Sequence, residues 1–282
     1  MIGTPSITVD ELLRRYDVFL LDAYGVLVAS GGPLPGAAAF LHRLEGAGKR
    51  WLIVSNDASR SPATTAARYQ GFGLPVDADR VLTSGLLLRD HFAAAGLEGA
   101  RCIVLGTEDS CDYVREAGGL IAPPTDDSAT VVVVADDDDY PFLDTINDVA
   151  TVLLRRLSRG HDTALVLPNP DVIFPAGPDA FGITAGAIAA ALEAVLRLRD
   201  PAGSHRFVPL GKPHRPMFEA AARRFPGVAR PRMVMLGDQL GTDILGAHRY
   251  GIDSVLVETG VARFAQLAGS DVRPTFTLPG VS

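Results

Sequence analysis

Cysteine is scarce in this chain, whose 282 residues include only Cys102 and Cys111. Two cysteines cannot form a disulfide framework, and their spacing fits neither a Cys-x-x-Cys redox pair nor a zinc site. Basic residues are also few: 26 Lys and Arg stand against 33 Asp and Glu, which gives a net charge of −7. Since no basic run offsets this charge, we expect no binding to nucleic acid.

Long apolar runs are missing as well, and we expect no signal peptide at the start of the sequence. The opening stretch, MIGTPSITVDELLRR, carries acidic residues and no long apolar segment, which argues against a signal peptide. The longest apolar candidate, Ile183 to Leu198, is interrupted by Glu193 and Arg197 and is too short to span a bilayer. We therefore expect a cytoplasmic protein that has no membrane partner.

Short apolar runs alternate with stretches of helical periodicity along most of the chain. Residues 17–21 (DVFLL) and 50–54 (RWLIV) predict buried strands, and the alanine-rich stretch 35–44 predicts a helix between them. Because the runs are apolar throughout instead of alternating, we expect sheets that are buried on both faces and built from parallel βαβ units. The predicted fold class is therefore α/β. Further runs of this kind are RCIVLG, TVVVVA, TALVLP, FVPLG, RMVMLGD and SVLVET.

Polar residues suited to phosphate chemistry follow several of these strands. Parallel strands bring their carboxyl ends to one edge of the sheet, where α/β proteins bind ligands. A carboxylate can attack phosphorus, oxygen atoms bind Mg²⁺, and a lysine neutralises phosphoryl charge. Each residue alone is also explained by a cap or a solvated surface, but the ordered set on buried strands predicts a phosphoryl-transfer site. The set comprises Asp22 in LLDAYGVL, Ser55 and Asn56 in IVSNDASRS, Lys212 in GKPHRP, and Asp238 and Asp243 in MLGDQLGTDILGA.

In this order the motifs resemble the haloacid dehalogenase-like (HAD) hydrolases, class IIA, the branch with sugar-phosphate and nitrophenylphosphate phosphatases. The resemblance extends from about residue 17 to 260. The interval of 157 residues from Ser55 to Lys212 is too long for a loop and is similar to the large cap of this class. The resemblance thus implies a Rossmann-like parallel-sheet core at 1–82 and 205–282, with an inserted α/β cap domain at 83–204 for substrate specificity.

The resemblance also implies roles for the catalytic residues. Asp22 would be the nucleophile, Ser55 would hydrogen-bond the phosphoryl group, and Lys212 would hold both Asp22 and the phosphoryl oxygens. The partner would be a small phosphorylated metabolite such as a sugar phosphate, and the cap would offer a surface for a homodimer. The residues that would contact the rest of the substrate are Asn56, Asn169 and Asp171, the last two in LPNPDVIFP.

A magnesium site is implied in the same way. Asp22 and Asp238 would bind Mg²⁺ through their carboxylates, and the backbone carbonyl of Tyr24 would complete the protein ligands. Asp243 would lie behind them and orient the site.

The side chain at position 24 departs from the family pattern. Phosphatases of this family carry Asp-x-Asp, whereas this chain has Asp22-Ala23-Tyr24. The second Asp supplies general acid–base catalysis, which is worth about 10²–10⁴-fold, and a phenol can donate a proton but is a poor base at neutral pH. Three interpretations stay open: slower hydrolysis or hydrolysis of esters with good leaving groups, a substitute residue such as His214, or phosphate binding without turnover.

The sequence therefore predicts a Mg²⁺-dependent phosphate-monoester hydrolase that acts through an aspartyl-phosphate on Asp22. The alternative is a non-catalytic protein that binds phosphorylated metabolites. The substitution at Tyr24 is the one sequence feature that favours it. The other motif residues argue against it. A receiver-type switch phosphorylated on Asp is disfavoured, because a receiver needs one small domain and no large insertion.

Overall fold

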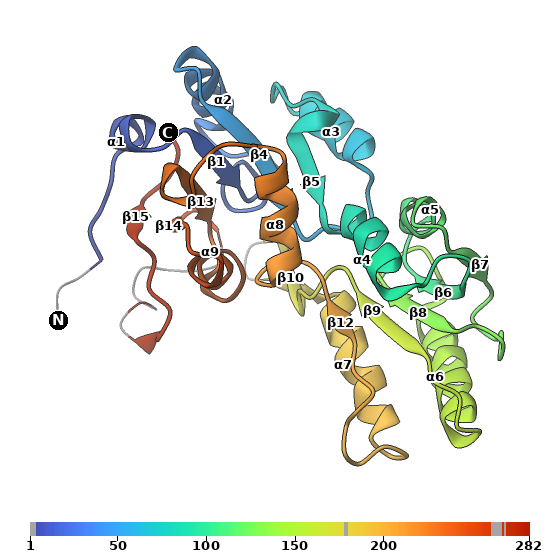
Figure 1. Cartoon of the computed structure of the whole chain (residues 1–282). Helices are drawn as coiled ribbons and strands as arrows, with labels where there is room; N and C mark the ends of the chain where they lie inside the picture. Colours follow the sequence, from blue (N-terminus) through green and yellow to red (C-terminus); the bar gives the residue numbers. More distant parts are fainter. Residues whose placement is uncertain (1–3, 178–179, 261–266, 268) are drawn as a thin grey trace. The chain divides into compact units, whose positions relative to one another are not determined.

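The computed structural model describes residues 4–177, 180–260, 267 and 269–282 (Figure 1). These residues divide into two compact units. The first unit lies within residues 1–55, 62–82 and 212–282, and the second lies within 56–61 and 83–211. In Figure 1 the first unit is drawn mainly in the blue and red ends of the colour scale and the second mainly in green and yellow. Residues 56–61 and 205–211 thus belong to the second compact unit, although the sequence-based boundaries place them with the core.

The first unit is built on a six-stranded sheet in the order β15-β14-β13-β1-β4-β5. β1 pairs in parallel with β13 on one side and β4 on the other, so that Leu21 lies opposite Leu236 and Ile53. This register brings the carboxyl ends of the three strands to the same edge of the sheet. The strands are β1 (Val18–Leu21), β4 (Arg50–Ser55), β5 (Val81–Thr83), β13 (Met233–Gly237), β14 (Asp253–Val257) and β15 (Phe276–Leu278).

Helices and short strands complete the first unit. Its core packs fully buried side chains such as Phe19, Phe40 and Trp51 between sheet and helices. α1 begins with a capping box in which the Thr8 hydroxyl and the Glu11 carboxylate each accept a backbone N–H. The elements are α1 (Val9–Arg15), β2 (Val28–Ala29), β3 (Gly32–Pro33), α2 (Ala37–Gly46), α3 (Pro62–Gly71), η1 (Ala78–Arg80), α8 (Arg215–Arg223), η3 (Arg230–Arg232), the π-helical η4 (Leu240–Ile244) and α9 (Leu245–Tyr250).

The second unit has its own five-stranded parallel sheet, in the order β12-β9-β8-β6-β7. All four valines of β8 are buried at the centre of this sheet. An antiparallel hairpin, β10–β11, forms a separate two-stranded sheet in this unit. The elements are η2 (Ser84–Leu86), α4 (Leu87–Ala95), β6 (Arg101–Leu105), α5 (Glu108–Glu116), β7 (Leu120–Ala122), β8 (Val131–Val134), α6 (Phe142–Ser158), β9 (Ala164–Leu167), β10 (Ile173–Gly177), β11 (Ala180–Ile183), α7 (Ala185–Leu196) and β12 (Val208–Pro209).

The predicted α/β fold with parallel sheets is confirmed. Each of the apolar runs singled out in the sequence contains a strand, because side chains covered on both faces of a sheet must be apolar at every position. The helix expected over 35–44 begins later, at Ala37, and ends at Gly46. Among the described residues, no helix combines the length and the apolar character needed to cross a membrane.

Candidate active site

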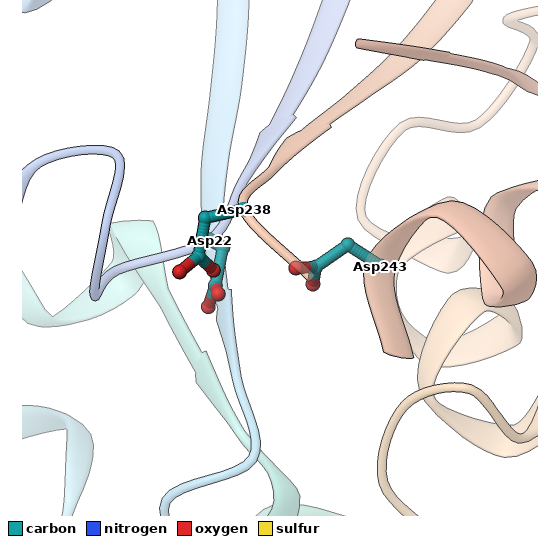
Figure 2. Close-up of side chains that lie close together, drawn as sticks. All are labelled: Asp22, Asp238 and Asp243. Carbon is teal, nitrogen blue, oxygen red and sulfur yellow. The ribbon is translucent and has the colours of Figure 1, made fainter. Parts of the chain in front are cut away.

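Three aspartates converge at the carboxyl edge of the first unit's sheet. Asp22 follows β1, Asp238 follows β13, and Asp243 lies in η4, directly after β13. One carboxylate oxygen from each lies within 4.8 Å of the others. Figure 2 shows Asp22 and Asp238 at the strand ends, with Asp243 reaching toward them from the start of the following helical segment. The parallel register of β1 and β13 produces this meeting, since it aligns the two strand ends.

Lys212 joins two of these carboxylates. Its Nζ atom lies 2.7 Å from Oδ1 of Asp22 and 2.8 Å from Oδ1 of Asp243. The lysine is 2% exposed and Asp243 is fully buried, so water does little to screen this interaction. The structure therefore brings together four residues that the sequence placed in one site.

One lysine, Lys212, forms ion pairs with two of the three clustered carboxylates, those of Asp22 and Asp243. The pKa of Asp243 is raised to about 7, because burial and then the charge of Asp22 raise it more than Lys212 lowers it. Burial alone would lower the pKa of Lys212, but the carboxylates of Asp22 and Asp243 outweigh it, so this pKa is raised. The lysine therefore keeps its charge beside the two acids.

The two oxygens of Asp22 have different surroundings. Oδ1 accepts hydrogen bonds from Nζ of Lys212 at 2.7 Å and from the backbone N–H of Ala23 at 2.8 Å. Both bonds fix the orientation of the carboxylate while leaving Oδ2 for a metal ion or a phosphorus atom. A carboxylate held in this way can act as a nucleophile, because its position is fixed before substrate binds.

Two glycines make room for the other aspartates. Gly25 has a φ of +76°, and a Cβ atom at this position would collide with the carboxylate of Asp238. A Cβ atom at Gly237 would likewise collide with the carboxylate of Asp243. The backbone therefore packs directly against both acids, and a side chain at either glycine would displace them.

The donor set of this cluster fits a hard divalent cation. Mg²⁺ takes oxygen ligands and is usually bound by one or two carboxylates with several waters. Asp22 and Asp238 supply two such carboxylates. Asp243 forms an ion pair with Lys212 through Oδ1 and accepts a hydrogen bond from the backbone N–H of Gln239 through Oδ2, at 3.1 Å. Because both of its oxygens are engaged within the protein, Asp243 is suited to orient the site from behind.

Ser55 ends the strand beside β1, and Tyr24 lies close to Asp22 in the chain. Ser55 is the last residue of β4, the strand beside β1, and it is buried. Tyr24 follows Asp22 by two residues, and its half-buried ring packs against the core of the first unit. Its hydroxyl accepts a hydrogen bond from Nη2 of Arg68 at 2.9 Å. His214, the other candidate for proton transfer, lies at the N-cap of α8.

The predicted substrate-binding residues form a group of their own in the second unit. Nδ2 of Asn56 donates to Oδ1 of Asp171 at 2.9 Å, and the backbone N–H of Asp171 donates to Oδ1 of Asn169 at 3.0 Å. Asn56 and Asn169 are buried. Hydrogen bonds therefore connect Asn56 with two residues that lie more than a hundred positions further along the chain, and contact with a substrate stays a prediction.

The segment 56–61, which follows Ser55, is held by the second unit through side-chain hydroxyls. Its backbone carbonyls from Asn56 to Arg60 each accept a hydrogen bond from a serine, threonine or tyrosine hydroxyl. The donors are Ser84 to Asn56 at 2.7 Å and to Asp57 at 3.2 Å, Ser110 to Ala58 at 2.8 Å, Thr107 to Ser59 at 2.6 Å and Tyr113 to Arg60 at 2.7 Å. Five carbonyls in succession are thus satisfied without a strand or a helix.

Sequence reasoning missed Arg68 and the hydroxyl donors of segment 56–61. Arg68 lies in the last turn of α3 and follows no strand, so the pattern of polar residues at strand ends does not identify it. The donors are single Ser, Thr and Tyr residues without a motif. Their contacts span 27 to 53 positions of the chain. No local pattern identifies partners at such a separation.

Comparisons with known proteins agree with this geometry. Residues 19–119 match the family described as haloacid dehalogenase-like hydrolase, and residues 209–282 match the one described as HAD-hydrolase-like. The chain is 32% identical to chronophin of Mus musculus over 257 residues, which cover 89% of this chain and 84% of chronophin.

Solved structures are similar over most of the chain. The crystal structure described as a possible sugar phosphatase of the HAD superfamily from Cytophaga hutchinsonii has a TM-score of 0.86 and 28% identity, with 99% of each chain covered. A glycerol phosphate phosphatase from Mycobacterium tuberculosis in complex with calcium has a TM-score of 0.81 and 25% identity, covering 96% of this chain and 75% of that one.

Proposed function

Since this chain belongs to the haloacid dehalogenase-like hydrolase family, we propose that it is a Mg²⁺-dependent phosphatase that hydrolyses phosphate monoesters through Asp22. The observation that carries the proposal is the buried cluster of three aspartates and Lys212 at the carboxyl edge of the sheet. Several buried carboxylates gathered around a fixed lysine are suited to binding a cation together with a phosphoryl group.

Each residue has a task in this reaction. Oδ2 of Asp22 attacks phosphorus, the bond to the leaving oxygen breaks, and that oxygen takes up a proton. Water then attacks the aspartyl-phosphate, which regenerates Asp22 and releases phosphate. Lys212 holds Asp22 in place and neutralises phosphoryl charge, and Ser55 donates its hydroxyl to a phosphoryl oxygen.

The metal would be held by Asp22, Asp238 and the backbone carbonyl of Tyr24, with Asp243 orienting the cluster. When bound, Mg²⁺ would offset the negative charge of the phosphoryl oxygens as the nucleophile approaches. The fit rests on carboxylate oxygens from three aspartates that lie within 4.8 Å of one another.

We infer that the substrate is a small phosphorylated metabolite. The relative from Mycobacterium tuberculosis is named for glycerol phosphate and the one from Cytophaga hutchinsonii for a sugar, and both names describe small polyhydroxy esters. The group formed by Asn56, Asn169 and Asp171 offers amide and carboxylate groups that suit hydroxyls. We propose that these three residues contact the substrate and that residues 83–204 act as the cap domain.

The proposal is tested by phosphate release from a panel of aryl, glycerol and sugar phosphates. We expect turnover that requires Mg²⁺, stops with a chelator and is lost in Asp22→Asn. The amide is nearly isosteric with the acid but cannot attack phosphorus. The control is a circular dichroism spectrum, which we expect to match the wild type, because Asp22 follows a strand instead of lying in the apolar core. Equal phosphate release by Asp22→Asn would contradict the mechanism.

The alternative is a protein that binds phosphorylated metabolites without hydrolysing them. The observation in its favour is Tyr24, which stands where the family has its second aspartate. Calorimetry on Asp22→Asn and on the wild type separates the two functions. If both proteins bind an ester tightly and neither releases phosphate, the binding protein is the correct description.

A further inference from the structure

The side chain of Tyr24 is fixed by a residue from a distant part of the first unit. Nη2 of Arg68 donates to the Tyr24 hydroxyl at 2.9 Å. The guanidinium carbon lies 5.7 Å from the centroid of the Tyr24 ring and 5.5 Å from that of Phe72. Arg68 therefore contacts two aromatic rings and bonds to one hydroxyl, which leaves the phenol little freedom to turn.

The charge of Arg68 is directed at this phenol. Among residues 4–177, 180–260, 267 and 269–282, no carboxylate forms an ion pair with its guanidinium. An arginine that served only to link α3 to the rest of the unit would gain more from an acid than from a neutral hydroxyl. The half-buried position of Arg68 and Tyr24 strengthens their interaction relative to a solvated pair.

The direction of this hydrogen bond determines what the Tyr24 hydroxyl can do. A guanidinium has donors and no acceptor, so the phenol oxygen must be the acceptor. The phenol proton is then left for another group, and no acceptor for it is found in the described part of the chain. Donation from a cation also polarises the O–H bond and makes it a stronger donor.

We propose that Arg68 is a positioning residue that holds the Tyr24 hydroxyl so that it donates a hydrogen bond to the leaving-group oxygen of the bound ester. This inference rests on the proposed function. It adds a residue that follows no motif and gives Tyr24 a role through its side chain beside that of its backbone carbonyl. The donor stabilises negative charge as the bond to phosphorus breaks, so its contribution grows as the leaving group becomes more basic.

The inference predicts a substrate preference. A nitrophenol leaves as a stable anion and needs little help, whereas phenol or a glycerol hydroxyl carries more charge on oxygen in the transition state. Loss of one preorganised donor costs about 10²–10³-fold in kcat. We therefore expect the pair formed by Tyr24 and Arg68 to matter little for nitrophenyl phosphate and strongly for phenyl phosphate and glycerol phosphate.

The test is a double-mutant cycle with Tyr24→Phe, Arg68→Gln and the double variant, each measured on the three esters with Mg²⁺. Phe keeps the ring and the backbone carbonyl and removes only the hydroxyl. The matched control is Arg80→Gln, because Arg80 also lies over a ring, that of Trp51 at 5.0 Å, and donates to a backbone carbonyl at 3.2 Å. Arg68→Lys keeps a charged donor and is expected to restore part of the activity.

We expect Arg68→Gln to lower kcat on phenyl and glycerol phosphate by about ten- to a hundredfold, since misplacement of a reacting group by about 1 Å has such an effect. Its KM and its kcat on nitrophenyl phosphate should stay close to the wild-type values. In the Tyr24→Phe background the same substitution should change nothing. Arg80→Gln should not distinguish among the three esters.

Several results would overturn the inference. An equal loss of kcat on all three esters, an effect of Arg68→Gln that persists in the Tyr24→Phe background, or a matching effect of Arg80→Gln would each show a merely structural role. Should Arg68→Gln fail to fold, the same comparison with Arg68→Lys gives the answer. If the wild type releases phosphate from none of the esters, the proposed function is wrong, and the inference is wrong with it. An active enzyme with an additive cycle overturns the inference alone.

Discussion

At the scale of single residues, Lys212 allows the acidic cluster to exist without a bound metal ion. It lies between Asp22 and Asp243 and is almost completely buried. Buried charges are tolerated only when they are paired, and removal of one partner leaves the other uncompensated. Lys212 therefore compensates the charge of buried acids in the folded protein even before substrate binds.

This task leads to a prediction for Lys212→Met. We expect the substitution to lower the free energy of unfolding by about 3–5 kcal/mol, because it leaves two buried carboxylates without their cation. Urea unfolding measures the loss, and added Mg²⁺ should recover part of it by binding the native state. The control is Lys49→Met, which removes a partner that lies 3.5 Å from the half-exposed Asp17 and should cost at most about 1 kcal/mol. Equal losses in the two variants would contradict the prediction.

At the scale of elements, segment 56–61 is a short piece of chain whose structure depends on the second unit. Its carbonyls accept hydrogen bonds from hydroxyls at the start of η2 and in and before α5. The side chain of Asp57 adds internal bonds to the N–H groups of Ser59 and Arg60, at 2.7 and 3.2 Å. The segment is therefore fixed by side chains instead of by a backbone ladder.

Ser110→Ala tests this dependence. Both Ser110 and Ala58 are buried, so the substitution leaves the Ala58 carbonyl without its donor and should cost about 1–3 kcal/mol. We expect faster proteolytic cleavage within 56–61 and faster amide exchange of Ser59 and Arg60. The matched control is Ser128→Ala, which removes an exposed hydroxyl from an Asp126 contact of 2.6 Å in the same unit and should change neither rate. Unchanged cleavage in Ser110→Ala would show that other contacts hold the segment.

At the scale of the whole molecule, stability depends on acids that folding shields from water. Asp136 follows β8 and starts the acidic run 136–139. It is half-buried beside segment 56–61. The pKa of Asp136 is raised to about 7, because burial and the charges of Asp137 and Asp57 raise it more than hydrogen bonds from the Asp137 backbone and the Ser59 side chain lower it.

The raised pKa of Asp136 gives stability a definite pH dependence. The native state keeps this proton between pH 3.8, the ordinary value, and about 7, whereas the unfolded chain loses it. The free energy of unfolding should therefore fall as pH rises through this window. Asp136→Asn should be more stable than the wild type above this window and gain nothing below it, as measured by urea unfolding. Asp138→Asn, in the exposed part of the run, is the control, and the same gain at both ends would contradict the prediction.

The sequence by itself determined the α/β class and the residues at the strand ends. Buried parallel strands are apolar at every position, so each one appears as a local run, and the residue after the run lies at the edge where ligands bind. Asp22 and Asp238 could be found in this way because each directly follows a strand of the first unit's sheet, and Asp243 lies in the segment after the second of these strands. Lys212 follows β12, which belongs to the other sheet, so its meeting with the acids depends on the tertiary structure.

Tertiary structure alone decided the contacts that complete the site. The hydrogen bond from Arg68 to Tyr24 joins residues 44 positions apart. The hydrogen bond from Ser110 to Ala58, within the second unit, joins residues 52 positions apart. It also decided which oxygen of Asp22 is engaged and how deeply Asp136 is shielded. Such contacts depend on where a helix packs against a sheet and how a side chain turns. Many sequences satisfy the same apolar pattern, so the pattern cannot specify these contacts.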